Sequence, residues 1–245
     1  MKDEILDLSV IIPCYNEEGV LEQNVLKIKE LLDDTIWRYE IILVDDFSGD
    51  RTVEIARRLA GSDKHIRLIC HSSNMGRGKT VEDGIRDARG KIAGFLDIDL
   101  QVPAHYILPL CIELENGADV ATAFRVYKMQ ISILDRYIAS KVYRLIFTVL
   151  LRTGIKDPET GYKFFNREKI LPVLDEIKDK YWFWDTEVMV RSYLRGYKIK
   201  EMKTLCMRDE SNKTTVKLFR DSIRHLKNII RFKKEVDQIR KGRSK

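Results

Sequence analysis

Two carboxylates, Asp97 and Asp99, stand two positions apart at the end of an apolar run. If this run is a β-strand, its alternation turns both side chains to one side, where they can hold one cation. Hard oxygen ligands of this kind select Mg²⁺ or Mn²⁺, and either ion would neutralise charge on a departing diphosphate. Solvated acids at a strand end would give the same pattern, so the pair indicates a metal site only in combination with other motifs.

A second pair of acids, Asp45 and Asp46, also follows an apolar run and precedes the turn-forming residues 47–52. One of these carboxylates could accept hydrogen bonds from a ribose or a base. Capping of the next helix accounts for Ser48 or Asp50, but it does not require two adjacent carboxylates. A ligand site and a simple turn both remain open for this pair.

A glycine-containing loop, residues 74–79, precedes a helical pattern. Its glycines would let backbone N–H groups approach a phosphate, with Arg77 or Lys79 adding positive charge. The loop matches neither a Walker loop nor the dinucleotide fingerprint, so its meaning depends on the other motifs.

Cationic groups follow in the second half of the chain. Arg136 and Ser140 lie four apart on an expected helix, residues 132–152, and therefore share a face that could bind a second anion. A solvated stripe on an amphipathic helix would give the same spacing. A further polar cluster in an irregular stretch consists of Arg208, Ser211 and Lys213.

Short apolar runs alternate with helical patterns over the first half of the chain. The apolar runs are residues 8–13, 40–45, 66–70, 91–97 and 118–123, and 199–205 is a later strand-like run. The helical patterns are residues 17–32, 50–60, 80–88 and 103–116. This alternation predicts an α/β fold with a mainly parallel sheet and helices on both faces. Ligands collect beyond the carboxyl ends of such strands, where the paired acids fall.

We expect one globular domain, residues 1–212, followed by a basic amphipathic helical tail, residues 213–245. The tail has twelve Lys or Arg and three acids, a charge of +9, which leaves −3 for the body out of a total of +6. Its apolar stripe is formed by Val216, Phe219, Ile223, Leu226 and Ile230. A stripe bordered by cations is typical of a helix in a bilayer interface, and a helix docked on the protein's own core would show the same pattern.

Composition argues against several other classes of protein. The four cysteines and four histidines show no metal-ligand spacing. No run approaches the ~18 uncharged apolar residues of a membrane span, and the charged first residues do not resemble a signal peptide. A basic tail suits RNA or an anionic membrane, but this tail offers only Phe219 and Phe232 for base stacking. We therefore expect no nucleic acid, and a cytoplasmic protein that is soluble or laid on a membrane.

Three motifs, residues 12–17, 44–48 and 97–101, occur in an order and spacing that resemble glycosyltransferase family 2. Later positions resemble the branch with dolichyl-phosphate mannose synthase and dolichyl-phosphate glucosyltransferase. These positions are Arg125, Arg136, Ser140, residues 156–161 and residues 208–211. Phe47 and Arg51 depart from the family pattern, in which glycines are common at both positions.

The resemblance implies a GT-A fold and inversion of the anomeric centre of the sugar. It implies a nucleotide-sugar site formed by Pro13, Tyr15, Glu17, Val44, Asp46, Asp97, Ile98, Asp99, Gln101, Arg125 and Arg208. The metal ligands in this set would be Asp97, Asp99 and Gln101, and the catalytic residues would be Asp99, Arg125 and Arg208. The residues implied for an acceptor phosphate are Arg136, Ser140 and Lys213.

The implied reaction moves mannose or glucose from GDP-mannose or UDP-glucose to a polyprenyl or dolichyl phosphate, with Mg²⁺ or Mn²⁺ as cofactor. A lipid phosphate is already ionised at neutral pH, so it needs no strong general base and catalysis reduces to positioning two anions. A hydroxyl acceptor, on a polysaccharide or a protein, would need a carboxylate such as Asp185 or Glu187. We expect peripheral association with the cytoplasmic face of a membrane, directly or through a membrane partner subunit.

Overall fold

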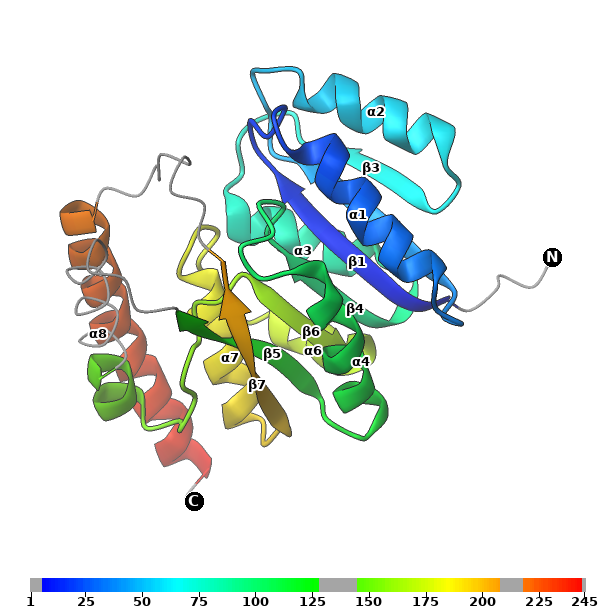
Figure 1. Cartoon of the computed structure of the whole chain (residues 1–245). Helices are drawn as coiled ribbons and strands as arrows, with labels where there is room; N and C mark the ends of the chain where they lie inside the picture. Colours follow the sequence, from blue (N-terminus) through cyan, green and yellow to red (C-terminus); the bar gives the residue numbers. More distant parts are fainter. Residues whose placement is uncertain (1–5, 128–144, 208–217, 244–245) are drawn as a thin grey trace.

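A seven-stranded sheet runs through the part of the chain that the computed structural model describes, which is residues 6–127, 145–207 and 218–243. The strands lie in the order β3-β2-β1-β4-β6-β5-β7 (Figure 1). They are β1 (Leu6–Cys14), β2 (Tyr39–Asp45), β3 (Ile66–Cys70), β4 (Gly90–Leu96), β5 (Val120–Tyr127), β6 (Tyr162–Asn166) and β7 (Ile199–Cys206). Strand β6 is antiparallel to both of its neighbours and every other pair is parallel. The expected mainly parallel sheet is confirmed.

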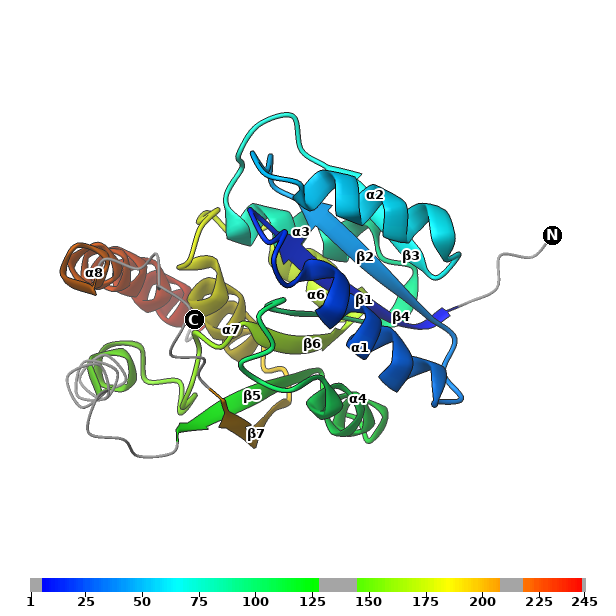
Figure 2. The ribbon, with the colours of Figure 1, turned by 45° about the horizontal axis from the view of Figure 1, so that its top comes forward.

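Helices cover both faces of this sheet (Figure 2). They are α1 (Leu21–Asp33), α2 (Thr52–Ser62), α3 (Arg77–Asp87), the 3₁₀ turn η1 (Ala104–Tyr106), α4 (Ile107–Glu115), α6 (Arg167–Leu174), α7 (Trp184–Leu194) and α8 (Leu218–Arg243). Buried residues of α1, α2 and α4 share one hydrophobic cluster, and those of α3, α6, α7 and α8 share another. Because the sheet is covered on both faces, β2 is buried along its whole length.

Three elements were not predicted from the sequence: β6, α6 and α7. Strand β6 is only five residues long and pairs with both β4 and β5. Gly94 on β4 makes this pairing possible, because a Cβ atom there would overlap the ring of Phe164. Helix α7 is buried at ten of its eleven positions, so it lacks the one-sided apolar pattern of a surface helix.

The C-terminal half of α8 docks on the body, and the one residue of the predicted apolar stripe whose side chain is described takes no part in this contact. Ile229, Phe232 and Val236 are buried in the cluster that contains α7, and Phe232 meets Phe183 edge-on with ring centroids 5.8 Å apart. Ile230, from the predicted stripe, is 49% exposed. The other stripe residues lie outside the part whose side chains are described. Apolar residues spaced three and four apart occur on more than one face of α8. Tertiary packing buries the face that contains Ile229, Phe232 and Val236.

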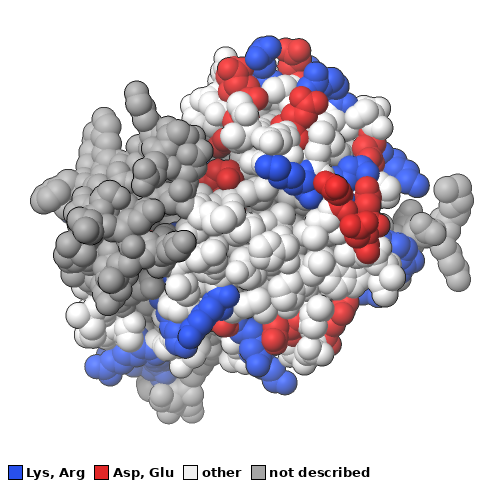
Figure 3. Space-filling model, viewed as in Figure 1, with Lys and Arg blue, Asp and Glu red and all other residues white. Residues whose placement is uncertain are grey.

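Charges of both signs lie among uncharged residues on the face of the molecule that Figure 3 shows. In the view of Figure 3, Lys and Arg are interspersed with Asp and Glu, and the described residues of this face form no continuous basic patch. None of the helices in residues 6–127, 145–207 and 218–243 combines the length and the apolar character that crossing a membrane requires.

A buried carboxylate, Glu40 on β2, ties three segments together. It accepts hydrogen bonds from Ser9 Oγ at 2.7 Å, from Arg89 Nη2 at 2.6 Å and from Arg67 Nη1 at 2.9 Å. Burial by itself raises the pKa of Glu40, but these hydrogen bonds outweigh burial and hold the pKa below its usual value. The ionised form of Glu40 therefore stabilises the fold.

Replacing Glu40 by Gln removes this ionised acceptor, and we expect a loss of about 1–3 kcal/mol in unfolding free energy at neutral pH. Because folding lowers the pKa, the contribution is complete above the unfolded value of 4.5 and declines as the pH falls below it. Urea unfolding of Glu40→Gln and wild type should show a difference that shrinks in acid. Glu30→Gln, at an exposed position of α1, should match wild type. A loss that does not depend on pH would contradict a role for the charge.

Candidate active site

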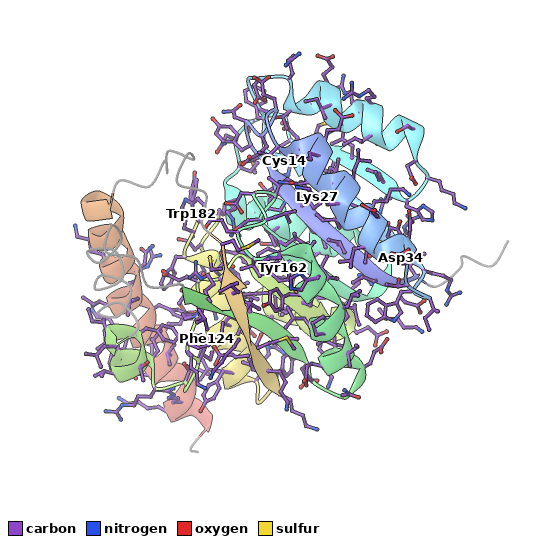
Figure 4. All side chains as sticks on the ribbon, in the orientation of Figure 1. Cys14, Lys27, Asp34, Phe124, Tyr162 and Trp182 are labelled. Atoms are coloured by element: carbon purple, nitrogen blue, oxygen red, sulfur yellow. The ribbon has the colours of Figure 1, made fainter. Side chains whose placement is uncertain are left out.

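The carboxyl ends of β1, β2 and β4 meet at one edge of the sheet, and the predicted acidic motifs lie there. Strands β1 and β2 pair up to Cys14 and Asp45, their last residues, and Figure 4 shows Cys14 at this edge. The loops that follow are tied together. The backbone N–H of Asn16 donates to Ser48 Oγ at 3.0 Å, and that of Gly49 donates to Asn16 Oδ1 at 2.8 Å. The two loops thus form one rim.

The backbone is strained in the loops at this edge. Asn16, Phe47 and Leu100, which follow β1, β2 and β4, have φ values of 56°, 67° and 51°. This left-handed region is unfavourable for residues with a side chain. Arg152 is the one other non-glycine residue with positive φ in the described ranges. Such conformations persist where surrounding contacts enforce them, and they concentrate at ligand-binding loops.

Asp45 and Asp46 shape the rim from inside, since their exposures are 1% and 3%. Asp45 Oδ2 accepts the two backbone N–H groups of residues 47–48. Asp46 accepts the N–H groups of Met75 and Gly76, at 2.7 and 2.9 Å. Both acids therefore hold neighbouring loops in place. The nucleotide contact expected for Asp46 stays a prediction.

The glycine loop, residues 74–79, packs closely against the start of α7 and the segment before it. A Cβ atom on Gly76 would lie 2.6 Å from the carbonyl oxygen of Lys180. One on Gly78 would lie 2.7 Å from Cγ of Trp184. Two N–H groups of the loop are already donated to Asp46. The structure therefore gives these glycines a packing role in place of the phosphate cradle that the sequence suggested.

Glu17, Asp97 and Asp99 bring three carboxylates to the rim. Burial raises the pKa of Glu17 to about 7, and Asp99 and Asp97 add repulsion. Burial, and next the charge of Asp97, also raise the pKa of Asp99. A hydrogen bond of 2.8 Å from Gln101 Nε2 to Asp99 Oδ2 acts in the opposite direction. Burial and mutual repulsion thus disfavour the charged forms of Glu17 and Asp99, and a divalent cation beside these carboxylates would favour them.

The donor set fits Mg²⁺ or Mn²⁺ shared with a ligand. Within the described parts of the chain, no three Asp, Glu, His or Cys side chains converge closely enough to hold a metal ion by themselves. Mg²⁺ commonly takes one or two carboxylates and completes its shell with phosphate oxygens and water. Arg77 engages Oδ1 of Asp97 and the side chain of Gln101 engages Oδ2 of Asp99, so the oxygens more open to a cation are Oδ2 of Asp97 and Oδ1 of Asp99.

Arg77 links Asp97 to helix α7 through a chain of ion pairs. Its Nε and Nη2 donate to Asp97 Oδ1 at 3.0 and 2.6 Å, and its Nη1 donates to Asp185 Oδ2 at 2.6 Å. The other oxygen of Asp185 accepts from Lys163 Nζ at 2.7 Å. Lys163 is fully buried, and burial lowers the pKa of its ammonium group. The guanidinium of Arg77 also lies 5.1 Å from the ring centre of Trp182, labelled in Figure 4.

Sequence reasoning missed this chain of ion pairs. Arg77 was expected to face a phosphate and Asp185 a hydroxyl acceptor, while Lys163 was given no role. Arg77 is separated from Asp97 by 20 positions and from Asp185 by 108, so only the fold brings them together. The available signal was a lysine inside the otherwise aromatic run 162–165.

Arg125 lies near the end of β5 in a bidentate pair with Asp157. Its Nε and Nη2 each donate at 2.9 Å to one oxygen of Asp157. The backbone N–H of Asp157 in turn donates to Glu201 Oε1 at 2.9 Å. The N–H of Met207, just past β7, donates to the carbonyl of Gln101 at 2.7 Å. The ends of β5 and β7 therefore reach the same site as the predicted metal ligands.

The remaining residues predicted for the nucleotide-sugar and acceptor sites differ in which groups they present to a ligand. Tyr15 is exposed on the rim, whereas the side chains of Val44 and Ile98 are buried and leave only backbone groups for a nucleotide. Pro13 is the register partner of Val44. The residues that lie outside the described part of the chain are Arg136, Ser140, Arg208 and Lys213.

The two carboxylates considered for a hydroxyl acceptor are both engaged and buried. Asp185 is held by the two cations described above. Glu187 Oε2 accepts the backbone N–H groups of residues 178–179, at 3.0 and 2.8 Å. Its other oxygen accepts from Arg191 Nη2 at 2.8 Å. These contacts anchor α7 and the segment before it.

Solved structures with this architecture include glucosyl-3-phosphoglycerate synthase from Mycobacterium tuberculosis. Its complex with Mn²⁺, UDP and glucosyl-3-phosphoglycerate has a TM-score of 0.70 and 18% identity, over 90% of this chain and 77% of the other. A complex with Mg²⁺ and UDP has a TM-score of 0.69 and 17% identity, over 90% and 77%. This likeness shows the fold, which is the GT-A fold expected from the sequence.

The model of glycosyl transferase family 2 matches residues 9–172, which contain all three acidic motifs. The chain belongs to glycosyl transferase family 2. Relatives include glycosyltransferase AglD of Haloferax volcanii, 31% identical over 80% of this chain and 32% of that protein. Dolichol-phosphate mannosyltransferase of Pyrococcus furiosus is 30% identical over 96% and 66%. Dolichyl-phosphate beta-glucosyltransferase of Saccharomyces cerevisiae is 26% identical over 93% and 74%. The chain thus spans about a third of AglD.

Gly161 lies where the chain passes Asp97. The N–H of Asp97 donates to its carbonyl at 3.0 Å, and a Cβ atom on Gly161 would overlap Asp97 Oδ2 and lie 2.6 Å from Arg77 Nη2. We expect Gly161→Ala to displace the Asp97 carboxylate and to slow sugar transfer about 100-fold, as a misplacement of about 1 Å can. Initial rates of nucleoside diphosphate release measure this. Gly19→Ala, where the new Cβ meets nothing within 4 Å, should keep the wild-type rate. Equal rates for the two variants would argue against this role.

Arg77→Met would leave Asp97 and the buried Asp185 without their shared cation. We expect the variant to lose about 3–5 kcal/mol of unfolding free energy, as when one partner of a buried ion pair is removed. Denaturant unfolding measures the loss. The control is Arg58→Met, which removes an exposed pair with Glu22 and should change stability by less than about 0.5 kcal/mol. A loss for Arg77→Met as small as the control's would show that the pair is not structural.

Proposed function

We propose that this chain transfers a hexose, mannose or glucose, from a nucleoside diphosphate sugar to a polyprenyl or dolichyl phosphate, with inversion at the anomeric carbon. The donor would be GDP-mannose or UDP-glucose. Family membership supports the reaction type. Relatives named dolichol-phosphate mannosyltransferase and dolichyl-phosphate beta-glucosyltransferase support the choice of acceptor.

One observation carries the choice of a phosphate acceptor: both carboxylates considered as general bases are occupied. Asp185 is held by Arg77 and Lys163, and Glu187 anchors α7. A hydroxyl acceptor needs a base within hydrogen-bond reach, whereas an ionised phosphate attacks as it is. Arg125, oriented by its bidentate pair, supplies a guanidinium on this side of the site, which suits an anion.

The reaction then requires little proton transfer from the protein. An oxygen of the lipid phosphate forms a bond to the anomeric carbon, while the bond from that carbon to the diphosphate breaks and the nucleoside diphosphate leaves with the electron pair. The residues that would hold the nucleotide are Pro13, Tyr15, Glu17, Val44 and Asp46. The residues that would meet the two anions are Arg125, Arg136, Ser140, Arg208 and Lys213. Catalysis rests on positioning the reactants and stabilising the leaving group.

Asp97, Asp99 and Gln101 would hold a divalent cation, Mg²⁺ or Mn²⁺, against the donor diphosphate. When bound, the ion neutralises charge on the departing diphosphate. Both ions occur in the solved structures of the M. tuberculosis synthase that share this fold. Arg77 contributes by fixing one oxygen of Asp97, so that the carboxylate is oriented before the ligands arrive.

We also propose that residues 1–212 act as the catalytic domain and that residues 213–245 attach it to the cytoplasmic face of a membrane, directly or through a partner subunit. The tail's charge of +9 suits an anionic lipid surface. The C-terminal half of α8 packs on the body through Ile229, Phe232 and Val236, so the attachment would involve its other faces.

With Mg²⁺ or Mn²⁺ present, we expect release of GDP or UDP from the matching sugar nucleotide when dolichyl phosphate is supplied, and no release above background with dolichol. Asp99→Asn should slow the reaction about 100- to 1000-fold, the range for removing one group that stabilises developing charge. Asp34→Asn, at an exposed position after α1, should keep the wild-type rate. Equal turnover of Asp99→Asn and wild type, or equal transfer to dolichol, would overturn the proposal.

A further inference from the structure

Phe47 presents an aromatic ring to solvent at the rim between β1 and β2. It comes directly after the buried pair Asp45 and Asp46, and its residue is 58% exposed. Tyr15, one residue past β1, is 51% exposed. Because Cys14 and Asp45 are register partners, the two rings follow adjacent strand ends. Two exposed aromatic rings therefore stand on the rim where the nucleotide is proposed to bind.

Hydrogen bonds fix the backbones that carry these two rings. Asn16, next to Tyr15, donates its N–H to the side chain of Ser48, next to Phe47. The N–H groups of Phe47 and Ser48 donate to Asp45 Oδ2 at 3.0 and 3.1 Å. A buried carboxylate thus holds the turn in shape, and the exposed ring is presented by an ordered backbone.

Hydrogen bonds to Asp45 maintain the backbone conformation of Phe47, but burial of its side chain does not offset the cost. Its φ of 67° is unfavourable for phenylalanine, whereas glycine adopts it freely and asparagine tolerates it. Because Phe47 is mostly exposed to solvent, burial of its ring offsets little of the free-energy cost of this backbone conformation. Strain retained at the edge of a candidate site, on a side chain with little structural role, indicates a role in binding.

A second feature of the same turn is a buried acceptor without a donor in the described part of the chain. Oδ1 of Asp45 is buried and, among the described residues, receives no hydrogen bond, although Oδ2 receives two. A buried acceptor without a donor is unfavourable. The turn therefore combines an exposed aromatic surface with an unsatisfied acceptor, and stacking together with hydrogen bonding is how proteins bind nucleobases.

We propose that the ring of Phe47 packs against the base of the bound nucleoside diphosphate and adds to the affinity for the donor. The inference rests on the proposed nucleotide-sugar function and deepens it by naming a base-binding residue. Stacking on an aromatic ring tolerates any base, because every base has a π-face. Phe47 therefore strengthens binding of GDP and UDP alike and does not choose between them.

The test removes the ring without straining the turn. Phe47→Gly and Phe47→Asn both accept a left-handed backbone, and Asn does so without the added flexibility of glycine. By calorimetry with Mn²⁺, each variant should bind GDP and UDP about 5- to 150-fold more weakly than wild type. The Tm of Phe47→Gly, without ligand, should be unchanged or raised by up to about 4 °C, because strain is relieved.

A matched control is Arg152→Gly, which relieves a positive φ at a residue whose carbonyl contacts Arg240 of α8. This variant should bind both nucleotides as wild type does. Wild-type affinity in both Phe47 variants would overturn the inference, and so would a lower Tm of Phe47→Gly, which would show that the ring stabilises the free protein. Failure of the wild-type protein to bind either nucleotide would overturn the proposed function itself, and this inference with it.

Discussion

The guanidinium of Arg77 holds the two halves of the candidate site together. It is the first residue of α3, and it bridges Asp97, which follows β4, to Asp185, which lies in α7. Asp185 is buried, so it needs both Arg77 and Lys163 to offset the loss of hydration. The second half of the domain can therefore pack stably only in a position where Arg77 reaches Asp185. The glycines of the loop before and within α3 allow that approach, because a Cβ atom at either position would collide with the segment that leads into α7.

Helix α7 extends this dependence to the end of the chain. Its Arg191 donates at 2.8 Å to Glu187 in the same helix and at 2.8 Å to Glu235 in α8. Phe232 of α8 lies against Phe183, just before α7. Helix α7, whose Asp185 pairs with the arginine that engages Asp97, therefore also anchors the C-terminal helix. Buried carboxylates in this part of the protein serve the architecture: Asp185 is held by ion pairs, and Glu187 by hydrogen bonds that anchor α7.

The side of the site proposed to bind the nucleotide is built differently from the side proposed to bind the acceptor. There, buried acids accept backbone N–H groups, and the loops after β1 and β2 are joined by short polar side chains. The positive φ values of Asn16 and Phe47 are maintained by these hydrogen bonds. Glu17, Asp97 and Asp99 remain as a cluster of negative charge with raised pKa values at two of its members. One side is ordered by backbone hydrogen bonding and the other by ion pairs, and the carboxylate cluster lies between them.

The sequence by itself determined the α/β class, the strands that carry the acidic motifs and the positions of the acids at strand ends. These features follow from the properties of neighbouring residues, such as apolar runs, alternation and turn chemistry. Only the tertiary structure decided that Asp185 pairs with Arg77, that residues 162–166 enter the sheet as an antiparallel strand, and that α8 docks through Ile229 and not through Ile230. Each of these outcomes depends on burial against residues far away in the chain. Local periodicity does not encode which partner a charge finds once water is excluded, and so the ion pairs became visible only in the fold.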